Sequence, residues 1–118
     1  MEKQMRTEVC RLIAGLVVAD DDLTAAEEAF LDRVLRTFEI PDSEREAIFP
    51  IIDKDEAAAT MRRLPQSAQH AALALLVEAT AADGVVAPEE RAYLDVVARE
   101  IGMSHAELDR AIAEQLTK

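Results

Sequence analysis

The sequence predicts an all-α protein, a compact bundle of about seven helices with an internal pseudo-twofold repeat. Apolar residues recur at helical spacing along most of the 118 residues, and no segment alternates as a strand would. Capping and turn-forming residues separate these segments at short intervals, and the second part of the chain repeats the first. A chain of this length can bury one core, so we expect residues 1–118 to form a single domain.

The first two helices have the clearest signals. The first is expected over about residues 2–19, where the apolar positions fall on one face. For the second helix, Thr24 is the expected N-cap and Glu27 completes a capping box. Pro41 sets the latest end of that helix.

Two weaker helices follow. We expect Asp42 or Ser43 to cap a short third helix that reaches about residue 49. The fourth is expected over about residues 55–64, because its pattern is amphipathic and Pro65 ends it.

The last three helices follow in close succession. Ser67 is the expected cap of a long, nearly apolar helix, which is the best candidate for the centre of the bundle. Asp83-Gly84 ends that helix, and Pro88 occupies the first position of the sixth, which reaches about residue 101. Ser104 caps the seventh. Its expected inward residues are Leu108, Ala111, Ile112 and Leu116.

A shift of 63 residues aligns the chain with itself without a gap. The halves are about residues 1–50 and 66–118, and many apolar positions coincide, such as Phe30 with Tyr93 and Val34 with Val97. Two acidic positions also coincide although they lie outside the apolar stripe: Asp20 falls on Asp83, and Glu27 falls on Glu90. This repeat predicts two halves related by an approximate twofold axis.

Composition excludes several classes of function. A net charge of −11 argues against nucleic-acid binding and against docking on anionic lipid. No apolar run is long enough to cross a membrane, and the first residues lack a signal peptide, so we expect a cytoplasmic protein without membrane insertion. The single Cys10 lies on an apolar stripe and is expected to be a small buried residue.

The two turns that precede the second and sixth helices are acidic. Residues 20–22 are all Asp, and Glu27 follows in the first turn of the next helix, as Glu90 follows Asp83. Carboxylates after a helix C-terminus are electrostatically unfavourable, and a bound cation would offset that cost. Oxygen ligands of this kind suit Ca²⁺ or Mg²⁺.

The same residues have a structural interpretation. Asp83-Gly84 is an ordinary turn pair, and Glu27 is already explained by the capping box. An EF-hand is excluded because Leu31 stands at the twelfth loop position, where a bidentate Glu is needed. The alternative function is therefore an interaction module with structural acidic turns, which binds a protein partner or forms a homodimer.

The second half resembles the TerB-like family, which comprises tellurite-resistance TerB proteins and related domains such as that of DjlA-type co-chaperones. The motif is carried by Ala82-Asp83-Gly84, Glu90, Ile101-Gly102-Met103-Ser104 and Glu107. The resemblance extends from about Leu12 to Ile112, with Asp21 in place of the motif's Gly in the first half.

This resemblance implies a helical bundle with a cytoplasmic role in the bacterial stress response and a divalent-metal site. Carried over by position, the metal ligands would be Asp20, Glu27, Asp83 and Glu90. Additional acidic residues near them are Asp21, Asp22, Glu28 and Glu89.

Catalysis has little support in the sequence. His70 and His105 have no Ser or Cys at a recognisable nucleophile spacing, and no Gly-rich phosphate loop is present. We therefore expect a protein that is not an enzyme and has no catalytic residues. A hydrolase that uses metal-bound carboxylates is the remaining enzymatic alternative.

Overall fold

A computed structural model describes residues 3–17, 24–44, 53–82, 84 and 86–117. All of the regular secondary structure in these ranges is helical, which confirms the predicted all-α bundle. Residues 42–44 are helical as well, and the rest of the expected third helix lies outside the described residues. The bounded helices are α1 (Lys3–Val17), α2 (Ala25–Thr37), α4 (Lys54–Arg63), α5 (Gln66–Ala81), α6 (Pro88–Glu100) and α7 (His105–Leu116).

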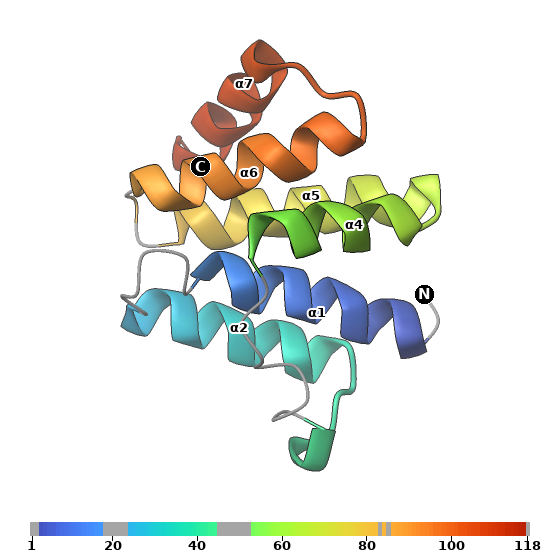
Figure 1. Cartoon of the computed structure of the whole chain (residues 1–118). Helices are drawn as coiled ribbons and strands as arrows, with labels where there is room; N and C mark the ends of the chain where they lie inside the picture. Colours follow the sequence, from blue (N-terminus) through green and yellow to red (C-terminus); the bar gives the residue numbers. More distant parts are fainter. Residues whose placement is uncertain (1–2, 18–23, 45–52, 83, 85, 118) are drawn as a thin grey trace.

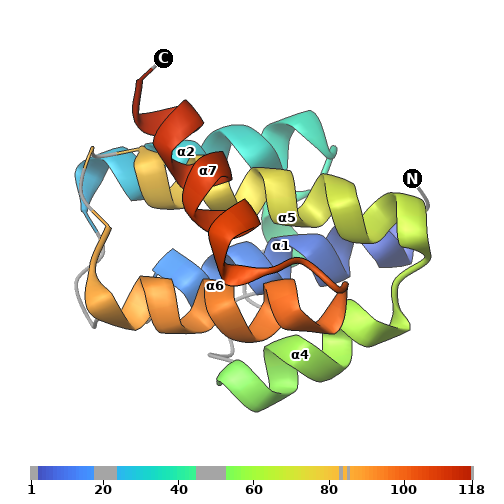
Figure 2. The same cartoon turned by 90° about the horizontal axis from the view of Figure 1, so that it is seen from above.

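The bundle is built around α1 and α5, which pack against each other and run in the same direction (Figures 1 and 2). Helix α2 packs on both of them, and so does α6. Helix α4 lies against α6 and α1, and α7 crosses α5 and α6. Helix α5 thus takes the central place predicted from its apolar sequence.

The described core follows the apolar stripes of the sequence. In α1 every residue from Leu12 to Val17 is buried, because this helix has neighbours on most sides. The hydroxyl of Tyr93 on α6 donates a hydrogen bond of 2.8 Å to the carbonyl of Leu12, and burial raises the pKa of that hydroxyl well above its usual value. Cys10 is fully buried, as predicted, and burial raises the pKa of its thiol to about 12.

The internal repeat is present in the structure. Shifted by 63 residues, α2 coincides with α6 at both ends, and α1 coincides with α5 to within one residue. Contacts between helices repeat in the same way, because α1 packs on α6 as α5 packs on α2. Two halves with equivalent contacts across α1 and α5 have the approximate twofold relation predicted from the sequence.

The ends of α2 and α6 show how closely the halves correspond. Each helix is followed by a residue in the left-handed region, Glu39 with φ 58° and Gly102 with φ 78°. The N–H groups of Ile40 and Met103 then bond to the carbonyls of Leu35 and Ala98, at 2.9 and 3.0 Å. Both ends are Schellman-type caps, and only the second has the glycine that this conformation favours.

Two details of the sequence-based prediction are wrong. Ser67 lies inside α5, which begins one residue earlier after Pro65, so Ser67 is not its cap. Leu116 is 43% exposed rather than inward, because it lies in the last turn of α7, past the buried Ile112.

No described helix is long and apolar enough to cross a membrane.

We expect Glu39→Gly to stabilise the protein by about 1 kcal/mol, because glycine adopts the left-handed conformation without steric cost. The exposed ion pair between Arg6 and Glu39, at 3.8 Å, contributes little and its loss should not reverse the gain. Chemical denaturation would measure the change. Gly102→Ala is the matched control and should destabilise, since a Cβ there meets no atom but strains the backbone. Equal stability of all three proteins would contradict this account.

Candidate functional site

Glu27 is a buried carboxylate in the first turn of α2. Its Oε1 accepts hydrogen bonds from the backbone N–H and the hydroxyl of Thr24, both at 3.1 Å. The N–H of Glu27 donates in return to Thr24 Oγ1 at 3.1 Å, which completes the predicted capping box. The residue is only 1% exposed, and within the described ranges Oε2 accepts no hydrogen bond.

Glu90 occupies the equivalent position in α6. Its Oε1 accepts a hydrogen bond of 3.1 Å from the N–H of Ala87, and the residue is 2% exposed. Ala87 stands where Thr24 stands in the first half and has no side-chain oxygen, so the reciprocal bond of the box is missing. The two glutamates therefore keep the same place and the same burial although their N-cap residues differ.

Capping alone does not explain this burial, because a third glutamate caps a helix from the surface. Glu107 in α7 accepts a hydrogen bond of 3.1 Å from the N–H of Ser104 and donates its own N–H to Ser104 Oγ. This glutamate is exposed. The backbone and side-chain hydrogen bonds with Ser104 lower the pKa of its carboxyl. An N3 glutamate can thus cap a helix without the desolvation that Glu27 and Glu90 undergo.

The remaining predicted ligands fall mostly outside the described residues. Asp20 and Asp83 lie there, as do residues 21 and 22, while Glu28 and Glu89 are described and exposed. The C-terminal ends of α1 and α5 and the first turns of α2 and α6 all lie at one end of the bundle (Figures 1 and 2). Glu27 and Glu90 are therefore on the same end of the molecule. Among the described residues alone, no group of three metal-ligating side chains is present.

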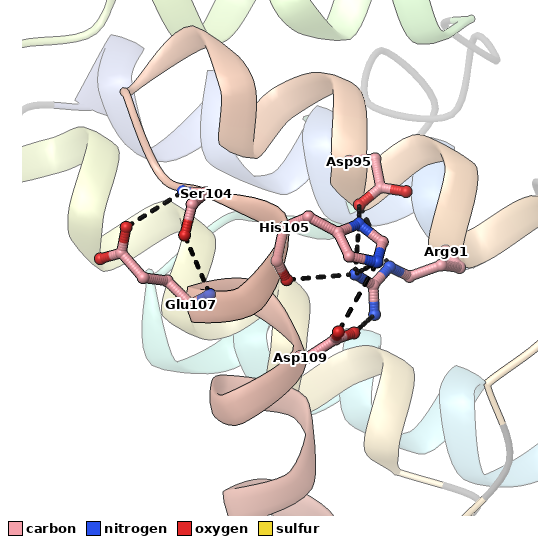
Figure 3. Close-up of polar contacts among 6 residues, drawn as sticks. All are labelled: Arg91, Asp95, Ser104, His105, Glu107 and Asp109. Carbon is pink, nitrogen blue, oxygen red and sulfur yellow. Dashed lines mark hydrogen bonds and ion pairs between the residues drawn. The ribbon is translucent and has the colours of Figure 1, made fainter.

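A polar cluster between α6 and α7 was missed by the sequence analysis (Figure 3). Arg91 donates from Nε to Asp95 at 3.1 Å, and from Nη1 to Asp109. Its Nη2 lies 3.0 Å from His105 Nδ1. His105 in turn lies 3.3 Å from Asp95 and 3.6 Å from Asp109, measured from its Nδ1 and Nε2 respectively.

The cluster links α7 to α6 by hydrogen bonds and ion pairs. It adds no candidate catalytic group to those that the sequence analysis considered. Two i,i+4 pairs, Arg91 with Asp95 and His105 with Asp109, were visible in the sequence. Their convergence depends on how α6 and α7 cross, which no local pattern shows. His105 is largely exposed, and the groups around it are an arginine and two carboxylates rather than a nucleophile.

Comparisons with known proteins support the fold alone. No family model matches the chain, and no curated protein matches it. The crystal structure of a protein of unknown function, PG1108 from Porphyromonas gingivalis W83, is similar in fold, with a TM-score of 0.64 and 20% sequence identity. The match covers 98% of this chain and 97% of that one, so the likeness extends over the whole bundle.

Glu27→Ala should destabilise the protein by about 2 kcal/mol, because it removes a buried side chain and the acceptor for the Thr24 N–H. Glu107→Ala removes the same kind of cap from an exposed position and should lower the free energy of unfolding clearly less than Glu27→Ala does. Urea unfolding of both variants would measure the difference. Equal losses would mean that burial of Glu27 adds nothing to its role as a cap.

The carboxyl of Glu107 should titrate below the ordinary glutamate pKa of about 4.3. Its contribution to stability should be complete above that value and should disappear as the pH falls through the lower pKa of the folded state. Ser104→Ala removes the hydroxyl of the capping box and should raise the pKa toward the ordinary value. NMR titration of the side-chain carboxyl measures both, and an unchanged pKa in Ser104→Ala would contradict the assignment.

Proposed function

We propose that this protein is a non-enzymatic, TerB-like helical bundle that binds a divalent cation and acts in the bacterial stress response. The site would lie at the end of the bundle where α2 and α6 begin. Its ligands would be Asp20 and Glu27 from the first half and Asp83 and Glu90 from the second.

The observation that carries the proposal is the burial of the Glu27 carboxylate. Desolvating a carboxylate is costly unless hydrogen bonds or an opposite charge compensate. Oε1 is engaged by the helix cap, whereas Oε2 is buried and accepts no hydrogen bond from the described residues. An N-terminal helix turn offers partial positive charge but only part of the compensation.

The donor set fits a hard cation. All four proposed ligands are carboxylates, and carboxylate oxygens are preferred by Ca²⁺ and Mg²⁺ over softer metals. The repeat supports the choice of residues, because the second half supplies a buried glutamate at the same helix position. In this proposal the ion would neutralise carboxylates that follow the C-termini of α1 and α5 in the sequence, and it would stabilise the fold without any reaction.

Thermal unfolding of the chelator-treated protein, titrated with Ca²⁺, Mg²⁺, Mn²⁺ or Zn²⁺, tests the proposal. At an ion concentration of about ten times Kd, mass action stabilises the folded state by about 1.4 kcal/mol, which raises Tm by roughly 6 °C for a domain of this size. We expect this shift for Ca²⁺ or Mg²⁺, saturating with concentration.

The informative variant is Glu27→Gln combined with Glu90→Gln, because glutamine keeps the oxygen acceptor of the cap but not the charge. It should fold and should lose the ion-dependent shift, as should Asp20→Asn with Asp83→Asn. Glu107→Gln makes the same chemical change at the exposed cap and should keep the shift. A parent protein that no ion stabilises, or a double variant that responds like the parent, would refute cation binding at these residues.

A further inference from the structure

Helix α4 covers a groove between α1 and α6. Its inner face consists of small residues around Met61, which is fully buried together with Ala57. Two ion pairs hold its C-terminal end. Arg62 contacts Glu100 of α6 at 3.0 Å, and Arg63 contacts Glu8 of α1 at 3.5 Å.

The repeat places an equivalent groove between α5 and α2, on the other side of the bundle from α4 (Figure 2). Within the described ranges no helix lies along it, and only Gln115 of α7 borders it at one end. One stripe of α6 ends at Glu100, which pairs with Arg62 of α4, and the residues of this stripe are half-buried, whereas their counterparts in α2 are exposed. The α6 stripe is Ala92, Val96 and Glu100, and the exposed counterparts are Ala29, Arg33 and Thr37.

Among the described residues, no repeat equivalent of α4 lies over the α5 side of this groove. The difference in cover is visible in the exposure of the residues at the bottom of the two grooves. Leu12 in the covered groove is fully buried, while its counterpart Leu75 remains partly exposed.

The uncovered surface is hollowed. One hollow of about 300 Å³ lies over Ala29, Phe30, Arg33 and Glu78, and a second of about 130 Å³ continues over Leu75 and shares the last three of these residues. Together they form one continuous depression, which we call the α2–α5 groove. The smaller hollow, over Leu75, is lined mainly by apolar surface, whereas the larger one is mainly polar and is also bordered by Gln115 of α7.

Two charges distinguish this groove from the one that α4 fills. Arg33 replaces Val96 on the α2 wall, and its guanidinium lies 5.1 Å from the centre of the Phe30 ring. Glu78 replaces Gly15 on the α5 wall. The walls thus carry opposite charges, and an occupant would be selected by complementary charges as well as by an apolar face.

We propose that the α2–α5 groove is the docking site for an amphipathic helix of a partner protein. The inner face of that helix has alanines around one methionine, as in α4, because the groove is the repeat equivalent of the one that α4 occupies. An acidic residue flanks this face toward α2 and a basic residue toward α5. The partner helix runs in the direction that α4 would have if the pseudo-twofold operation placed α4 in this groove.

Two stapled peptides test the proposal with the full-length protein. Both peptides carry the inward-facing residues of α4. One peptide has Glu on the side of this face that meets α2 and Lys on the side that meets α5, and the other has these two residues exchanged. Stapling forms the helix before binding and removes its ordering cost. We expect NMR shift changes at Ala29, Leu75 and Glu78, and about tenfold tighter binding when the acidic flank faces α2, a difference typical of one favourable charge pair.

Charge reversal makes the test specific. Arg33→Glu combined with Glu78→Lys should exchange the preference between the two peptides. Ala29→Arg should abolish the binding of both, whereas Ala106→Arg, on the exposed face of α7, should leave it unchanged.

Three results would overturn the proposal. The first is that neither peptide shifts groove resonances up to about 1 mM, which corresponds to a binding free energy of about −4 kcal/mol. The second is that binding persists in Ala29→Arg. The third is that the unliganded protein sediments as a dimer that Ala29→Arg converts to a monomer, since the occupant would then be a second copy of this chain.

Discussion

The packing of α1 on α5 is the contact on which the rest of the structure depends. Each of these helices is the repeat equivalent of the other, and each of them also packs against both α2 and α6. Because they run in the same direction, the approximate twofold axis runs along them rather than across them (Figures 1 and 2). A substitution that separated the two helices would therefore remove the shared core of both halves at once.

The parallel direction of α1 and α5 also determines where the acidic residues of the two halves lie relative to each other. Parallel α1 and α5 end together, so the helices that follow them begin together, and both buried glutamates come to one end of the bundle. An antiparallel pair would have put Glu27 and Glu90 at opposite ends. The arrangement of the core thus decides whether the acidic positions of the repeat can act as one site, before any property of the individual carboxylates is considered.

Local patterns were sufficient for most of the fold and for part of the candidate site. The spacing of apolar residues predicted the helices, and the Thr24–Glu27 pair predicted its own hydrogen bonds, because both depend on neighbours within a few residues. The burial of Glu27 could not be predicted in this way, since a capping pattern is the same whether the helix end is covered or, as at Glu107, exposed.

The same limit explains the other differences. The convergence of Arg91 and His105 depends on the crossing of two helices, and the weak, alanine-rich pattern of α4 gave no sign that it fills a groove. Among the described residues the counterpart of that groove is not filled by a helix, and this becomes visible only when the two halves are compared in three dimensions.

The hydrogen bond between Tyr93 and the Leu12 carbonyl gives the protein an internal spectroscopic reporter. The chain has one tyrosine and no tryptophan, so this ring is the dominant near-ultraviolet fluorophore. It is held on α6 of the second half while its hydroxyl is bonded to α1 of the first. Its emission and near-ultraviolet circular dichroism therefore follow the association of the two halves, separately from the helix content that the far-ultraviolet signal reports.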